Sequence, residues 1–426
     1  MLISDLLQPD PPNAGFVGVE REYRVLDEAL EQLDFRVMVH KLGMPGSGLD
    51  PGDPNAHHLP SGLLLTADGP EAEVATPPVP LAPGCTRLVS MSAEHGEDAL
   101  VEFLPAGAGI EGFSTHLNVS VGDDVVAIAA LFARHFALGM MLLLDRPDSP
   151  GLLVRPRPGR LEVGGDFAAG EQLRVALTFA TGATRCCADA VRDRSTAALP
   201  PEPRGRIAAA RDRPGWFIGR GTFARDLYDT GREATVRCGP TTTRAGDRLA
   251  EEWAAARRVL PELLDEEELS AVDEVVDGRR AIPIESVSPP DSTATPTALD
   301  SPFANLAARE RAGLQVQVEA MSWAAVAFRV QSRSHAATHV VIPRRWLRSF
   351  LRQLDDGALD AALHTAELVD AGIGGPRLVA AGFDPRCVVP PEPMLRISWW
   401  RDRRPELIGL AVGCAVVVAG FRGWPW

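Results

Sequence analysis

The chain has 426 residues, 45% of them hydrophobic, and can therefore form one large packed domain or two ordinary ones. Its formal charge of −14 argues against nucleic acid or an anionic membrane as the main partner, and it is compatible with an enzyme that binds cations. The six cysteines lack metal-ligand spacing and no leader segment is visible, so we expect a cytoplasmic location.

The first 165 residues predict mainly short strands. A polar arm over residues 1–14 is followed by a first strand, a short helix at 27–32, and a Gly/Pro-rich loop at 43–61. A long apolar helix is expected at 125–144. By alternation and β-propensity, strands are expected at 16–26, 34–42, 63–66, 72–75, 100–104, 114–120 and 152–163.

The rest of the chain predicts helices, a linker and a smaller region. Helices are expected at 173–194, 243–260, 262–277, 345–354 and 358–368, and strands at 314–331 and 338–342. The composition of residues 285–302 is typical of a linker, which separates a domain at 1–284 from a C-terminal α+β region at 303–426. The apolar segment 407–421 is shorter than the ~20 residues of a membrane span, so we interpret it as buried.

Four short segments place acid, imidazole or guanidinium groups along strands: residues 18–23, 71–78, 114–120 and 155–163. The third is the clearest. Since side chains alternate across a strand, Ser114, His116, Asn118 and Ser120 share one face, and the residues between them are predicted to face the core. Such a polar face is unusual if the strand has a structural role alone.

The donor types point to a cation and a phosphate. Carboxylates at Glu20, Glu22, Glu73 and Glu162 with the imidazole of His116 make an oxygen-rich set that suits Mg²⁺ or Mn²⁺ rather than zinc. Guanidinium groups match phosphate oxygens bidentately, and this segment has three, at Arg155, Arg157 and Arg160. Carboxylates, divalent metal and arginines together are what phosphoryl transfer from a nucleotide requires.

Each signal has a structural interpretation as well. Alternating Glu20 and Glu22 are equally typical of an exposed strand face, and a single histidine is more often a partly buried structural residue than a ligand. Glu73 fits an edge strand, and the arginines fit a surface ion-pair cluster. The recurrence of the pattern on four separate strands favours a functional site.

The four segments in order resemble the motifs of the glutamate–cysteine ligase-like carboxylate–amine ligases, in the glutamine synthetase superfamily. Residues 18–23 (GVEREY) resemble their G-V-E-x-E-[FY] strand, and residues 73–78 (EVATPP) their E-[IV]-x-T-P strand. Residues 114–119 (STHLNV) are similar to the H-x-[HN]-[VI] motif, and residues 155–162 to the later R…R-x-E strand. The resemblance covers about the first 165 residues, and Arg21 departs from it, standing where the ligases often have Glu.

The resemblance implies an α+β fold: a curved antiparallel sheet whose concave face forms the active-site cleft, with helices packed on the outside. It implies that ATP phosphorylates a carboxylate, typically of glutamate, and that an amine attacks the acyl phosphate. By position, Glu20, Glu22, Glu73, His116 and Glu162 would hold Mg²⁺ (or Mn²⁺), Asn118, Ser120 and Arg157 would bind the nucleotide, and Arg155 and Arg160 would stabilise the transferring phosphate.

Several alternatives stay open at this point. The amine acceptor is expected to be a small molecule, but a peptide or carrier-protein acceptor fits the acidic surface, and a homo-oligomer is compatible with the sequence. A kinase that stops at phosphorylation would consume ATP without an amine. A non-catalytic nucleotide-binding scaffold would have no need for all five acid and histidine positions.

Overall fold

The structure is a computed structural model. It describes residues 15–39, 56–59, 62–122, 124–210, 214–285, 309–311, 314–323, 325–332, 335–355, 367–370 and 376–379. The chain divides into two compact units, residues 1–43 with 61–305 and residues 44–60 with 306–426. Apart from Glu285, the predicted linker at 285–302 lies outside the described residues, as do the predicted arm at 1–14 and the apolar segment at 407–421.

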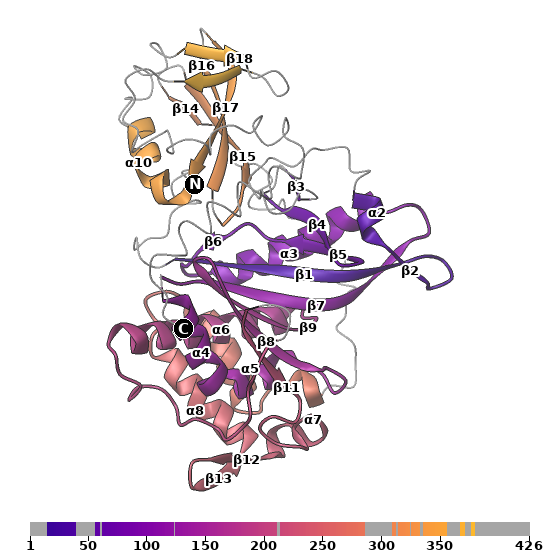
Figure 1. The fold of residues 1–426 in the computed structure, drawn as a ribbon, viewed down its shortest axis with the longest axis vertical. Coiled ribbons are helices and arrows are strands. Elements are labelled where there is room, and N and C mark those ends of the chain that lie inside the picture. The colour runs from indigo at the N-terminus through magenta and orange to yellow at the C-terminus, as the bar shows by residue number, and fades with distance from the viewer. Residues whose placement is uncertain are drawn as a thin grey trace. The chain divides into compact units, whose positions relative to one another are not determined.

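The first unit confirms the predicted α+β class, with a large antiparallel sheet and helices (Figure 1). The sheet order is β10-β11-β8-β9-β7-β1-β5-β4, and β2 and β6 also pair with β1. Its strands are β1 (Phe16–Leu26), β2 (Gln32–Leu33), β4 (Leu64–Asp68), β5 (Glu71–Ala75), β6 (Val79–Pro80), β7 (Gly109–Ser120), β8 (Gly151–Arg157), β9 (Arg160–Asp166), β10 (Ala208–Ala209) and β11 (Trp216–Gly219).

The smaller elements complete this unit. Two strands, β12 (Thr235–Cys238) and β13 (Thr241–Arg244), form a separate hairpin. The helices are α2 (Phe35–Val39), α3 (Cys85–Phe103), α4 (Val125–His135), α5 (Ala137–Leu144), α6 (Gly170–Arg192), α7 (Leu227–Thr230), α8 (Ala245–Arg257) and α9 (Glu266–Val276), with short 3-10 turns at η2 (Gly231–Glu233) and η3 (Pro283–Glu285).

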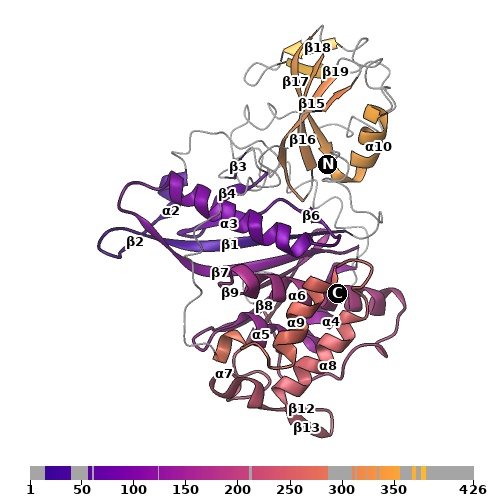
Figure 2. The ribbon, with the colours of Figure 1, turned by 180° about the vertical axis from the view of Figure 1, so that it is seen from behind.

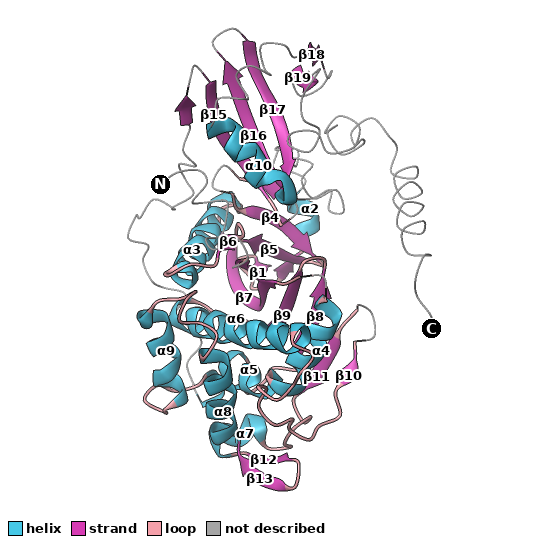
Figure 3. Cartoon of the chain, turned by 90° about the vertical axis from the view of Figure 1, so that its left-hand side faces the viewer, coloured by secondary structure: helices cyan, strands magenta, loops and turns pink. Residues whose placement is uncertain are grey.

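One face of the sheet is the core of this unit. On β1, Val17, Val19, Tyr23 and Val25 are at most 2% exposed and point toward the helices. Helices α3 and α6 pack on this side, and Figure 3 shows α6 lying across the direction of the strands. Because side chains alternate, the even-numbered residues of β1 face the opposite side of the sheet, and Glu20 and Glu22 are among them.

The helix α3 was not predicted, and the strand expected at 100–104 is wrong because these residues belong to the end of α3 and the turn after it. Its buried face consists largely of small side chains, among them Cys85, Ser92, Ala93 and Gly96, rather than a stripe of large apolar ones. A Cβ atom at Gly96 would lie 2.3 Å from Val74 Cγ1, so the small face permits close contact between α3 and β5.

The predicted helix at 125–144 is two helices, α4 and α5, which meet at Phe136 with a bend of 72°. All eight residues of α5 are buried. Among the described residues, no single helix is both long and apolar enough to cross a membrane, and only this bent pair passes such a test together.

Two short N-terminal predictions are wrong. Residues 27–32, predicted as a helix, form a turn that leads into β2. Residues 35–39, predicted as a strand from alternating apolar residues, form α2. In α2, Phe35 and Val39 are buried one helical turn apart, whereas Val37 is 63% exposed, which is the helical rather than the alternating pattern.

The second unit contains a four-stranded antiparallel sheet of β14 (Arg309–Arg311), β15 (Leu314–Met321), β16 (Ala325–Ser332) and β17 (His335–Pro343). Helix α10 (Arg344–Asp355) packs beside β16 and β17, as Figure 2 shows. A hairpin follows, β18 (Glu367–Asp370) with β19 (Pro376–Val379). The predicted helix at 358–368 lies mostly outside the described residues, and its last two residues are in β18. The two-residue strand β3 (His57–His58) is also described.

Candidate functional site

The strand register brings the predicted residues into rows across one face of the sheet. Glu22 on β1 is opposite Glu73 on β5 and Ser114 on β7. In the next row, Glu20 is opposite His116. In the row after it, Asn118 is opposite Glu162 on β9, which is opposite Arg155 on β8. Five strands, of which only β8 and β9 are close together in the sequence, thus place their polar faces on one surface.

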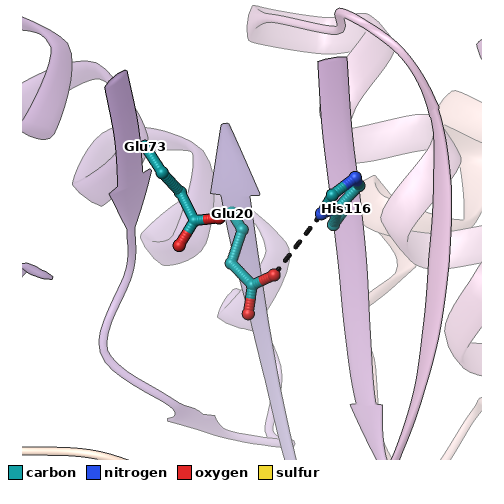
Figure 4. A group of neighbouring side chains, drawn as sticks. All are labelled: Glu20, Glu73 and His116. Atoms are coloured by element: carbon teal, nitrogen blue, oxygen red, sulfur yellow. Dashed lines mark ion pairs between the residues drawn. The ribbon is translucent and has the colours of Figure 1, made fainter. Parts of the chain in front are cut away.

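The centre of this surface is a compact group of possible metal ligands. Glu20, Glu73 and His116 each offer an atom within 4.8 Å of the others, and Figure 4 shows their side chains pointing toward one another from β1, β5 and β7. His116 Nδ1 lies 3.5 Å from Glu20 Oε2. Gly164 leaves room for the imidazole, since a Cβ atom there would lie 2.8 Å from its Cδ2.

A second group shares Glu73 with the first. It consists of Glu22, Asp68 and Glu73, whose oxygen atoms also lie within 4.8 Å of one another. Ser114 Oγ donates a hydrogen bond of 2.6 Å to Glu22 Oε2 and so orients that carboxylate. Two adjacent three-ligand groups with one shared carboxylate suit a pair of hard cations. We refer to Glu20, Glu22, Asp68, Glu73 and His116 as the acid cluster.

Electrostatics within the acid cluster favour added positive charge. Burial, with the nearby charges of Glu20 and Glu22, raises the pKa of Glu73 well above its usual value. Burial also raises the pKa of Glu22. Burial would lower the pKa of His116, but its hydrogen bond with Glu20 and the charges of Glu22 and Glu162 raise it. Protons therefore supply positive charge that a divalent cation would replace, and the oxygen-rich donor set fits Mg²⁺ or Mn²⁺.

Glu20 differs from the other carboxylates. Its burial would raise its pKa, but the hydrogen bond with His116 and the positive charge of Arg160 lower the pKa to about 2. Arg160 Nη2 lies 3.5 Å from Glu20 Oε1. Glu20 is therefore ionised throughout the physiological range, as a permanent cation ligand would be.

The predicted arginines lie beyond His116 along the strands, on the same face. Arg155 and Arg157 both form ion pairs with Glu162, the second with 2.5 Å between Arg157 Nε and Glu162 Oε2. Glu162 is fully buried, and its Oε1 lies 4.0 Å from His116 Nδ1. Neither three-ligand group includes Glu162. Its role as a metal ligand therefore stays a prediction. What the structure shows is that Glu162 forms ion pairs with two guanidinium groups.

The residues predicted to line the nucleotide lie at this arginine end. Asn118 Oδ1 accepts a hydrogen bond of 2.7 Å from Arg160 Nε. Ser120 Oγ accepts one of 2.6 Å from the backbone N–H of Phe16, and Ser120 is opposite Arg160 in the strand register. The arrangement is thus polarised along the strands, with guanidinium groups at one end and carboxylates at the other.

Arg21 lies outside this surface. It is 1% exposed on the core face, where Arg21 Nη2 forms an ion pair of 2.7 Å with Glu97 Oε2 of α3. Its guanidinium carbon lies 4.5 Å from the ring centroid of Phe167. Arg21, which departs from the ligase motif, therefore joins the sheet to α3. It does not change the charge of the acid cluster, because it lies on the other face.

A cavity of about 880 Å³ adjoins the acid cluster on the side away from the arginines. Glu22, Ser114 and His116 are among its lining residues. Asn118, Ser120 and the three arginines of the predicted site are not among its lining residues. The cavity is of the size of small-molecule sites, which are typically about 300–1,000 Å³.

Sequence reasoning brought together most of this surface but missed Asp68. The alternation of Leu64, Thr66 and Asp68 on β4, with Thr66 opposite Glu73, was the available signal. The strand predicted at 63–66 ends before Asp68, which directly precedes the Gly69-Pro70 turn, where aspartate is common for local reasons.

Comparisons with known proteins show likeness in structure but not in sequence. No protein-family model and no curated protein matches the sequence. Among solved structures, the chain is similar to a chain in the crystal structure of the complex between prokaryotic ubiquitin-like protein Pup and its ligase PafA. The two have 12% sequence identity and a TM-score of 0.37, over 65% of this chain and 64% of that one. The chain thus matches slightly less than two thirds of that structure's length.

Proposed function

We propose that the protein is an ATP- and Mg²⁺-dependent carboxylate–amine ligase, with residues 1–284 as its catalytic domain and a cytoplasmic location. In this reaction a carboxylate oxygen attacks the γ-phosphorus of ATP and ADP leaves. An amine then attacks the acyl carbon, inorganic phosphate leaves, and the amine loses a proton as the amide forms. The carboxylate of glutamate or a related amino acid is the donor that the motif resemblance favours.

One observation carries the proposal: two three-ligand groups share Glu73 and lie next to guanidinium groups on the same face. Phosphoryl transfer requires little covalent chemistry from a protein and depends on positioning and charge neutralisation. Bound divalent cations would neutralise phosphate charge here. The acid cluster would hold them, and Ser114 would keep the Glu22 carboxylate in place through its hydrogen bond.

We assign the remaining residues by their position along the strands. Arg160 contacts both Glu20 and Asn118, so it is well placed to orient a phosphate group beside the cluster. Arg155 and Arg157 flank Glu162 and add positive charge at the same end, and Ser120 lies there as well. The cavity at the opposite end would then receive the amine substrate.

The test is ADP release by the purified full-length protein with ATP and Mg²⁺. Carboxylate donors and amines are supplied singly and in pairs, and the amine panel includes peptides with a lysine. We expect release that requires both substrates and falls at least a hundredfold in Glu73→Gln, because loss of the shared carboxylate disturbs both three-ligand groups.

A matched control is Glu102→Gln, which removes the charge of an exposed carboxylate on α3. It should retain full activity. Release with a carboxylate alone would favour the kinase alternative. ATP binding without turnover across the whole panel would favour a non-catalytic scaffold, and full activity of Glu73→Gln would overturn the assignment of the metal site.

A further inference from the structure

The cavity beside the acid cluster has an apolar floor that continues a row of cross-strand neighbours. The row that begins with Glu20 and His116 passes through Gly164 on β9 to Leu153 on β8 and Phe217 on β11. Three strand steps separate His116 from Phe217, a distance of roughly 14 Å at the usual strand spacing. The floor therefore leads from the cluster to an aromatic ring near the sheet edge.

A β-bulge adds a second aromatic ring to this cavity. The register between β1 and β7 shifts between Glu22 and Tyr23, which leaves Phe113 as the extra residue beside Ser114. Strict alternation would turn Phe113 away from the face that Ser114 occupies, but its ring centroid lies 4.6 Å from the guanidinium carbon of Arg24, an even-numbered residue of β1 on that face. Bulges often re-aim a side chain beside an active site, and this one exposes 38% of Phe113.

Few other large apolar side chains in the described part of the chain are as exposed as these two rings. Phe113 and Phe217 are 38% and 39% exposed, and Val101 on the same cavity is 51% exposed. The other large apolar residues with comparable exposure in the described part of the chain are Leu30, Val37 and Val126, none of which lines the cavity. Exposed apolar side chains gathered at one cavity indicate a ligand that covers them.

The charged residues that line the cavity indicate the sign of the ligand's charge. Five carboxylates line it, those of Glu22, Glu97, Glu111, Asp148 and Asp166, against the guanidinium groups of Arg24 and Arg146. Glu22 belongs to the acid cluster and Glu97 is paired with Arg21, which leaves three carboxylates against two guanidinium groups. Arg24 Nη1 lies 3.5 Å from Glu111 Oε2, and its guanidinium carbon lies 4.6 Å from the ring centroid of Phe113. The excess negative charge attracts a cation and repels a second carboxylate.

We propose that this cavity binds the amine substrate, and that the amine is a cation attached to an aromatic or long aliphatic group. This inference rests on the proposed function and names its acceptor. The amino group would lie beside Asp166, which is opposite Ser114 in the register and next to the acid cluster, and the apolar part would lie against Phe113, Leu153 and Phe217. A volume of about 880 Å³ suits such a molecule better than a small hydrophilic amino acid.

The test is calorimetric binding to the full-length protein without ATP, with three probes. 4-Phenylbutylamine carries both the cation and the ring, butylamine lacks the ring, and 4-phenylbutanoate has the opposite charge. We expect 4-phenylbutylamine to bind at least tenfold more tightly than either of the others. Phe113→Ala and Phe217→Ala should each weaken it about tenfold, and Val126→Ala, an exposed apolar residue outside the cavity, should leave it unchanged.

The outcomes separate this inference from the proposed function. Equal or tighter binding of 4-phenylbutanoate, or of butylamine, would overturn the inference. Binding of 4-phenylbutylamine that requires Phe113, in a protein that never releases ADP, would support the assignment of the cavity and overturn the ligase. Dependence of ADP release on small hydrophilic amines alone would overturn the inference and leave the ligase intact.

Discussion

Glu20 and His116 face each other across β1 and β7, with 3.5 Å between Glu20 Oε2 and His116 Nδ1, and Glu73 approaches both from β5. The histidine is thus surrounded by carboxylates. The three side chains come from segments about 50 residues apart in the chain, so only the pairing of the strands brings them together.

Replacement of Glu73 by Gln should abolish cation binding and stabilise the cation-free protein. The carboxylates of Glu20, Glu22 and Asp68 repel that of Glu73, and the neutral amide removes this repulsion. We expect Mn²⁺ to raise the melting temperature of the wild type, with about 2.7 kcal/mol of stabilisation at a hundred times the dissociation constant. Thermal melts with increasing Mn²⁺ measure this. A Glu73→Gln variant that keeps the full shift would contradict it, and Glu102→Gln is the control.

Replacement of Glu162 by Gln should destabilise the protein strongly. Arg155 is 2% exposed and would lose the carboxylate that balances its buried charge. Breaking a buried ion pair in this way costs about 3–5 kcal/mol. Urea unfolding measures the change, and the double variant Arg155→Met/Glu162→Leu should recover most of the loss. A single variant as stable as the wild type would show that the pair contributes little.

Replacement of Arg21 and of Arg160 by Met should have opposite effects, because the two arginines lie on opposite faces of the sheet. Arg21→Met removes the ion pair with Glu97 and the contact with Phe167, so we expect a loss of about 1–3 kcal/mol in stability. Its ADP release per folded molecule should be unchanged. Arg160→Met should retain stability to within about 1 kcal/mol and lose most of its activity. Urea unfolding and ADP release, measured in parallel on both variants, test these expectations. Equal losses of activity in the two variants would refute the assignment of Arg21 to the core face and Arg160 to the site face.

The stability of the protein should fall as pH rises through the titration of Asp145. Burial raises the pKa of this fully buried carboxyl to about 7, even though a hydrogen bond from Tyr228, 2.5 Å from Tyr228 Oη to Asp145 Oδ2, lowers it. The folded chain therefore holds a proton that the unfolded chain releases. The resulting stabilisation is complete below the unfolded pKa of 3.8 and is lost as pH rises through about 7.

Asp145→Asn should remove this dependence, which is on the order of 3 kcal/mol between pH 4 and 8. Urea unfolding at a series of pH values measures it. Tyr228→Phe removes the hydrogen bond that lowers the pKa, so its stability should fall more steeply with pH than that of the wild type. The exposed Asp148→Asn is the control. Parallel pH profiles for Asp145→Asn and the wild type would disprove the assignment.

The faces of the site strands were predictable because alternation is a local property. Glu20 and Glu22, or His116 and Asn118, share a face wherever their strand pairs. Which strands become neighbours depends on contacts between distant residues, so the grouping of Glu73 with His116 rested on the donor types and the motif resemblance rather than on strand pairing. The ion pairs of Glu162 with Arg155 and Arg157 depend in addition on the hairpin of β8 and β9, which turns at Pro158-Gly159 within the segment 152–163 that was predicted as one strand.

The helices that were missed have identifiable physical causes. The buried face of α3 is built from small residues such as Ser92 and Gly96, so it has no large apolar stripe to detect. The segment from Val125 to Leu144 is apolar without Pro at its centre, and nothing local marks the bend at Phe136. In α2, five residues are too few to distinguish a helical from an alternating pattern.

The alternation along β1 also limits how this gene can change. Substitutions at Glu20 or Arg21 affect one face at a time, whereas deletion of a single codon between Val17 and Glu20 would exchange the two faces downstream of it. Arg21 would then enter the acid cluster, and Glu22 would be pressed against α3. We therefore expect replacements in this strand to impair either stability or activity in a mutational scan, whereas the insertion or deletion of one residue should impair both.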